Sequence, residues 1–147
     1  MDEWISATRC WSPSPSPDGT AIAFVWDGDG RPQVRLHHRA TGEEWSIDTG
    51  EDLVSSVRWS PDGAWLAVET APDGGERTHV SIIRPDGTDL RPVRGVGDGD
   101  RGAVTLDRFT HTGSVLAITE SDYDTTTAWL VDADSSQRQR VGSGHAL

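Results

Sequence analysis

The sequence predicts an all-β protein built from three repeated units of four short antiparallel strands. A ten-residue pattern starts at Ser16, returns at Ser60 and returns again, in degenerate form, at Thr110, with spacings of 44 and 50 residues. Its copies are SPDGTAIAFV, SPDGAWLAVE and THTGSVLAIT. No segment keeps the 3.6-residue apolar period of an amphipathic helix, so helix content is expected to be minimal.

Each unit contains four strand-like runs separated by Gly, Pro, Asp or Ser. The first run precedes the turn: VSSVRW (54–59), VTLDRF (104–109) and, less regularly, ISATRCW (5–11), which an extra SPSP separates from its turn. The second run follows the turn and is apolar on both faces, as in strands buried between two layers. The third and fourth runs form a hairpin: QVRLHH–RATGE–EWSID, THVSII–RPDGT–DLRPV and TTTAWLV–DADSS–QRQRV.

The turn between the first and second runs has specific chemistry. In Ser-Pro-Asp-Gly, Pro presets φ near about −65°, and Asp can bond the backbone of its own turn. Gly then takes the left-handed conformation that lets the next strand pair back. The structural turn residues are Pro17, Asp18, Gly19, Pro61, Asp62, Gly63 and, in the third copy, Gly113.

Four-stranded units of about 40–45 residues are typical of β-propeller blades. The predicted fold class is therefore a partial β-propeller of three four-stranded antiparallel blades, at about 5–49, 53–95 and 103–141. Residues 142–147 are interpreted as a link to a further blade or a tail. Closed propellers have about 4–8 blades, so three blades leave two bare outer faces that something must cover.

Aromatic side chains are expected to supply much of the core between blades, because a buried indole removes a large apolar area from water. The residues expected to pack between adjacent blades are Trp59, Trp65 and Phe109. Trp26, Trp45 and Trp129 lie in strands and could do the same. Trp4 and Trp11 could cover an open edge or touch a partner, but structural packing is the favoured role for all seven Trp.

The charge balance excludes several classes of partner. The net charge is −11, with 13 basic residues against 24 acidic ones. Nucleic-acid binding needs a cationic stripe, and an anionic membrane surface would repel the chain for the same reason. No apolar run reaches the length of a membrane span, and the start lacks the pattern of a signal peptide. Cys10 is the single cysteine, so the expected location is the cytoplasm.

No catalytic or cofactor site is predicted within the chain. The G-x-S-x-G turn of α/β-hydrolases does not occur, and 142–144 lacks both its spacing and its helix. No metal site is predicted either, because the five His residues lack the spacing of metal ligands. His37 and His38 must point to opposite faces of a strand, and a solvated edge is the favoured reading.

Acidic and basic clusters have simple interpretations. The pairs Asp27/Asp29, Asp98/Asp100 and Asp122/Asp124 could hold Ca²⁺, but hairpin turns are favoured, because a third acidic position and a distant Glu are missing. Four arginines could neutralise the carboxylate of a peptide terminus. They are Arg91, Arg94, Arg101 and Arg108, and local ion pairs with Asp98, Asp100 and Asp107 are the simpler account.

The residues WSPDG, an AWLAV-type strand and a hairpin with RPDGT at its tip resemble TolB-like, WD40-like propeller repeats. These repeats are similar to the blades of prolyl-oligopeptidase-type serine peptidases, including acylaminoacyl peptidases. The passage AFVWDGDGRPQVRLHH (23–38) looks like part of a first blade in those peptidases, and the resemblance runs from about Ile5 to Val141.

The resemblance implies a non-catalytic propeller segment that gates peptide access to a hydrolase domain. Further blades and that domain, which would carry the catalytic Ser, Asp and His, would be its partners, so no catalytic residue is assigned here. The alternative is a TolB-like protein-interaction module in which a second copy closes a six-bladed ring. A third reading is a blade fragment without a role of its own. Each of these three hypotheses must explain what covers the two bare outer faces.

Overall fold

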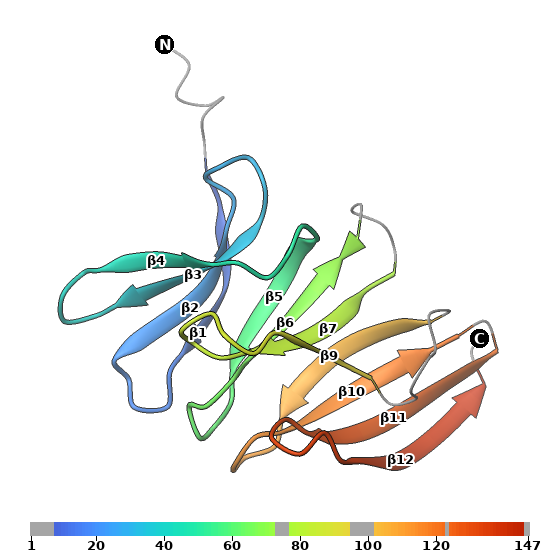
Figure 1. Ribbon diagram of the computed structural model, residues 1–147. Helices are drawn as coiled ribbons and strands as arrows, with labels where there is room; N and C mark the ends of the chain where they lie inside the picture. The colour runs from blue at the N-terminus through green and yellow to red at the C-terminus, as the bar shows by residue number, and fades with distance from the viewer. Residues whose placement is uncertain (1–7, 73–76, 95–101, 123, 146–147) are drawn as a thin grey trace.

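The computed structural model describes residues 8–72, 77–94, 102–122 and 124–145. These residues contain twelve β-strands and no α-helix. The strands form three four-stranded antiparallel sheets set side by side, and none of the described sheets closes on itself (Figure 1). The predicted fold class is confirmed: the chain is a partial propeller of three blades.

Each blade is a meander whose strands pair in chain order. Blade 1 consists of β1 (Cys10–Pro15), β2 (Ala21–Trp26), β3 (Gln33–His38) and β4 (Glu44–Ile47). Blade 2 consists of β5 (Leu53–Trp59), β6 (Leu66–Ala71), β7 (His79–Ile83) and β8 (Arg91–Val93). Blade 3 consists of β9 (Ala103–Phe109), β10 (Val115–Ser121), β11 (Thr125–Asp132) and β12 (Arg138–His145).

The first strand lies later in the chain than the sequence predicts. The expected run was 5–11, of which 5–7 lie outside the described residues, whereas β1 is Cys10–Pro15 and contains the SPSP segment. Two prolines fit there because β1 is an edge strand, where a missing N–H removes no bond from the centre of a sheet. A register shift between Trp11 and Ser14, with Ser12 at a φ of 57°, accommodates the segment.

The last strand is longer than the sequence predicts. Residues 142–145, interpreted as a link or tail, belong to β12 and pair with β11 as far as His145 opposite Thr125. A bulge between Ala128 and Trp129 shifts the register, and pairing continues beyond it. The link interpretation was wrong for these residues, because a bulge let a Gly-rich segment keep its ladder hydrogen bonds.

The repeated turn is built around a buried serine hydroxyl. Ser60 Oγ donates to Asp62 Oδ1 at 2.6 Å and accepts from the Trp65 backbone N–H at 3.0 Å. Ser16 makes the same two bonds in blade 1, to Asp18 and from Ala21. The bonds from the Ser16 hydroxyl and from Thr20 lower the pKa of Asp18 to about 2. The sequence pointed to Pro, Asp and Gly, and the serine completes the turn.

Glycine ends the turn in the left-handed conformation that the sequence predicts. The φ angles of Gly19, Gly63 and Gly113 are 76°, 75° and 74°. The third value shows that the turn of blade 3 keeps this geometry without the proline. Proline therefore preorganises the turn, whereas glycine meets its conformational requirement.

Replacing Gly63 by Val is expected to lower the free energy of unfolding by about 1–3 kcal/mol, because a β-branched residue is strained at positive φ. A Cβ at Gly63 would also lie 3.4 Å from Cγ of Pro17 in the neighbouring turn. Urea denaturation of the variant measures the loss. Gly144→Val is the control, since that glycine has open space around it. A Gly63→Val protein as stable as the wild type would contradict this account of the turn.

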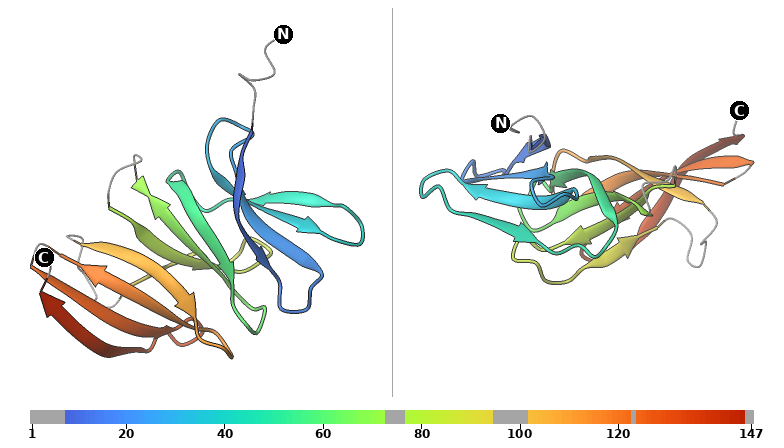
Figure 2. Two further views of the ribbon diagram at one scale, coloured as in Figure 1. Left: turned by 180° about the vertical axis from the view of Figure 1, so that it is seen from behind. Right: turned by 90° about the horizontal axis from the view of Figure 1, so that it is seen from above.

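Two apolar cores lie between the blades rather than within them. The core between blades 1 and 2 consists of Ala23, Val25, Val34, Leu36, Ile47, Val54, Val57, Leu66, Val68 and Ile83. The core between blades 2 and 3 consists of Trp65, Ala67, Val80, Ile82, Val93, Val104, Leu106, Leu116, Ile118, Val131 and Ala133. Blade 2 is thus covered on both faces, and blades 1 and 3 each have one uncovered face (Figure 2).

Candidate functional site: the two uncovered blade faces

Each blade has a forward face, turned toward the next blade in chain order, and a back face, turned toward the previous one. The strand registers place equivalent residues of the three units on equivalent faces. On the forward faces, β2 pairs Ala23 with Leu36 of β3, and β6 pairs Ala67 with Ile82 of β7. All four side chains are buried between blades. This small–large pair is the centre of both inter-blade contacts.

Blade 3 carries the same pair on its uncovered forward face. Ala117 of β10 pairs with Leu130 of β11, and both are half-buried, with no described residue covering them. The fourth strand differs. Ile47 and Val93, which pair with Val34 and Val80, are each 3% exposed, whereas blade 3 has Gly142 paired with Ala128 at that position and Val141, 61% exposed, in the bulge beside it. The forward face of blade 3 therefore keeps the small–large apolar pair of an inter-blade contact and leaves it uncovered.

The back faces repeat a different pattern, two large aliphatic residues from the second strand. In blade 2 these are Leu66 and Val68, and in blade 3 they are Leu116 and Ile118; all four are buried. Their counterparts in blade 1 are Ile22 and Phe24, which are half-buried. They line a shallow groove of about 280 Å³ together with Cys10, Trp11, Pro13 and His37.

The third strand makes the back face of blade 1 different from the other two. Leu66 pairs with Ile83 and Leu116 with Val131, but Ile22 pairs with His37. The outer half of this back face is therefore polar where both internal contacts are aliphatic. This substitution is the most distinctive feature of the blade stack.

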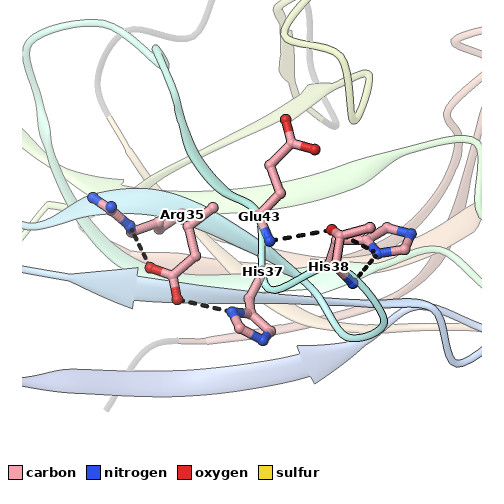
Figure 3. A network of polar contacts seen from close by, with 6 residues as sticks. Arg35, His37, His38 and Glu43 are labelled. Atoms are coloured by element: carbon pink, nitrogen blue, oxygen red, sulfur yellow. Dashed lines mark hydrogen bonds and ion pairs between the residues drawn. The ribbon is translucent and has the colours of Figure 1, made fainter.

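A charged cluster occupies that polar half (Figure 3). Glu44 of β4 accepts from Arg35 Nε at 3.1 Å and contacts His37 Nδ1 at 2.8 Å. These bonds, from His37 first and then from Arg35, hold the pKa of Glu44 below its ordinary value of 4.5. The Arg35 guanidinium also lies 4.2 Å from the centre of the Trp26 ring. His38 points away from His37 and contacts Thr41, so the two histidines use opposite faces.

Side chains of β1 bind the backbone of β5 and join blade 1 to blade 2. Trp11 Nε1 donates to the Ser55 carbonyl at 2.9 Å. Ser12 Oγ donates to the Val57 carbonyl at 3.2 Å and accepts from its N–H at 3.1 Å. Trp11 packs against the core between blades 1 and 2, and it also lines the groove on the uncovered back face of blade 1. Trp4 lies outside the described residues.

Polar side chains also join blade 2 to blade 3. Trp65 Nε1 donates to Asp134 Oδ1 at 2.8 Å, and Ser114 Oγ donates to Asp134 Oδ2 at 3.0 Å. These two bonds, the first from Trp65, hold the pKa of Asp134 below its ordinary 3.8. Glu69 Oε2 accepts from the Leu106 N–H at 2.9 Å. Glu69 and Asp134 could not be predicted from local sequence patterns, because their partners are distant in the chain.

Most of the expected packing residues lie between blades. Trp65 is fully buried in the core between blades 2 and 3, against which Phe109 and Trp129 also pack. Trp45 and Trp59 pack against the other core. Trp26 does not; it lies on the uncovered back face of blade 1 beside Arg35.

The acidic pairs form turns where the structure describes them. Asp122 Oδ1 accepts from the backbone N–H groups of Asp124 and Thr125, both at 2.9 Å. Asp27 Oδ1 accepts from the Arg9 N–H, and Asp29 from Gln33. Asp98 and Asp100 lie outside the described residues. Within the described part of the chain, no group of three His, Cys, Asp or Glu residues could hold a metal ion.

Among the residues that the structure describes, Asp107 at the entrance of blade 3 has a hydroxyl rather than an arginine as its partner. Asp107 Oδ2 accepts from the Thr119 hydroxyl at 2.8 Å. Arg91 lies 4.9 Å from the centre of the Trp65 ring, and the Arg94 carbonyl accepts from Arg138. Arg101 lies outside the described residues.

Comparison with known proteins identifies the type of blade. The Tol-Pal system protein TolB of Alcanivorax borkumensis is 39% identical over 64 residues, 43% of this chain and 15% of that protein. The putative TolB of Agrobacterium tumefaciens superposes on 93% of this chain and 50% of its own, with a TM-score of 0.70 and 16% identity. The three sheets are propeller blades that resemble those of TolB.

Propellers of peptidases share the same blades. A prolyl endopeptidase superposes on 93% of this chain with a TM-score of 0.68 and 14% identity, and the match spans 22% of that enzyme. The likeness to this enzyme is one of fold, and the sequence predicts it. No protein-family model matches the chain. The chain spans half or less of the length of these relatives. Among the described residues, no helix is long and apolar enough to cross a membrane.

Proposed function

We propose that this chain is a non-catalytic protein-interaction module built from TolB-like propeller blades. The observation that supports it is the pair of uncovered faces, one of which repeats the small–large apolar pair buried in both internal contacts. A face of that composition gains free energy by leaving water, so it favours association with another protein surface. The described residues offer packing, turns and inter-blade bonds rather than an arrangement of nucleophile and base.

The sequence match supports this proposal over a role in a peptidase. The 39% identity is to TolB, whereas the likeness to the prolyl endopeptidase is at 14% identity and shows the fold alone. A ligand of the module would bind at the loop-lined ends of the blades, where propellers carry variable loops. The proposed location is the cytoplasm, which the single cysteine supports.

A second candidate is the gate of a prolyl-oligopeptidase-type serine peptidase. The fit of 93% of the chain to a prolyl endopeptidase propeller favours it. In that role, the chain would admit peptides to a hydrolase domain that lies outside it, and further blades would cover its open faces.

A serine-reactive probe distinguishes the two candidates. The chain is isolated from its source under native conditions, and the preparation is treated with a fluorophosphonate. The interaction module predicts that no polypeptide present in equal amount with the chain becomes labelled. A labelled polypeptide in equal amount would contradict the module and support the peptidase gate.

A further inference from the structure

We propose that the partner of the two uncovered faces is a second copy of this chain, so that two copies close a six-bladed ring. The forward face of blade 3 in each copy would pack on the back face of blade 1 in the other. This inference rests on the interaction module proposed above and names its partner. The ring would have two identical seams related by a twofold axis, as in most homodimers.

The internal contacts provide the template for each seam. Between blades 1 and 2, Leu36 of the forward face and Val68 of the back face belong to one core. The residues at the same positions of the open faces are Leu130 and Phe24. Both are apolar and half-buried, so joining the two faces would bring together the same kinds of side chain that already pack twice in this chain.

The length of the matched TolB structure also favours a second copy. The three blades superpose as one body on half of the Agrobacterium chain. The other half of that chain is as long as another set of three blades. A second copy has both the blade type and the length to fill that half.

The polar cluster of blade 1 has a polar counterpart on blade 3. Gln139 of β12 pairs with Leu130 of β11. Trp45 in blade 1 and Arg91 in blade 2 occupy the same register position as Gln139. In the seam, this amide would be placed toward the Arg35–His37–Glu44 cluster, and an amide can both donate and accept hydrogen bonds. Each seam would thus be apolar along its inner half and polar along its outer half. We expect it to be weaker than the internal contacts, because burying ion-paired groups costs solvation.

Two charge variants test the ring, because each changes a different half of the seam. Phe24→Asp changes blade 1 and Leu130→Lys changes blade 3. In a dimer of either variant alone, the substituted face would take part in both seams. Each variant alone is therefore expected to have the mass of one chain. An equal mixture can form a heterodimer with one wild-type seam and one Asp–Lys seam. Native mass spectrometry is expected to show two-chain particles containing one of each variant.

The matched control is His111→Glu, which adds charge in an exposed turn of blade 3 away from both faces. It is expected to form dimers like the wild type. Ile22→Asp with Ala117→Lys is a second pair, used if circular dichroism shows that a first-pair variant has lost its β-structure. A wild-type chain that is monomeric at tens of micromolar overturns the proposal, as do single variants that still dimerise or a mixture that stays monomeric. A monomeric chain that carries no serine-reactive partner removes the ring and leaves the interaction module standing.

Discussion

Replacing Trp65 by Ala is expected to lower the free energy of unfolding by about 3–5 kcal/mol, the usual cost of deleting a large buried aromatic side chain. Trp65 is 0% exposed and belongs to the core between blades 2 and 3. The deletion would also remove the indole bond to Asp134 and the contact with Arg84, whose guanidinium lies 3.7 Å from the ring centre. One substitution therefore leaves a cavity and removes one of the two hydrogen bonds to the Asp134 carboxylate and the ring beneath the Arg84 guanidinium.

Urea denaturation followed by circular dichroism measures this loss. Trp26→Ala is the matched control, because Trp26 contacts Arg35 but lies half-exposed on an uncovered face. Its expected loss is clearly smaller. Equal losses for the two variants would show that burial between blades does not determine the stability of this fold.

A second pair of variants compares one repeat position in two environments. Leu36→Ala is expected to lower the free energy of unfolding by about 2–5 kcal/mol, as is usual for a fully buried leucine. Leu36 is 1% exposed between blades 1 and 2. Leu130 occupies the same position in blade 3 but is uncovered, so Leu130→Ala is expected to have a much smaller effect in dilute solution.

Protein concentration separates the two effects further. If a second copy covers Leu130, the cost of Leu130→Ala grows as concentration rises and the wild type gains stability by association. The cost of Leu36→Ala does not change in this way. Thermal unfolding over a hundredfold range of concentration tests the comparison, and an unchanging cost at Leu130 would speak against a partner on that face.

The turn residues and the alternation of apolar and polar residues were enough to predict most of the fold from the sequence. QVRLHH, predicted as a strand, is β3 residue for residue, because Gly30 and Gly42 bracket it with turns. The two ends of the chain were less predictable. At β1, prolines and a positive φ at Ser12 occur inside a strand, and at β12 a bulge carries the pairing through Gly142 and Gly144. Bulges change the register without any strong sequence signal.

The candidate site was only partly predictable for a related reason. The number of blades was enough to predict two bare outer faces. Which residues lie on those faces depends on the register of each hairpin, which the sequence does not show. An alignment of the third strands of the three units would have placed His37 at the position of Ile83 and Val131. It would thus have indicated that half of the back face of blade 1 is polar. The bonds of Glu69 and Asp134 join different blades, and local patterns do not encode such distant pairs.

The native mass of the chain at tens of micromolar tests the central claim most directly. A non-denaturing mass spectrum is predicted to show twice the 15.9 kDa of one chain. The reason is that each copy has one uncovered forward face and one uncovered back face, and each can pack on the other kind of face in the second copy. Dilution is predicted to release single chains, since each seam has a polar half. A spectrum with only the mass of one chain across that range would contradict the claim that the uncovered faces bind one another.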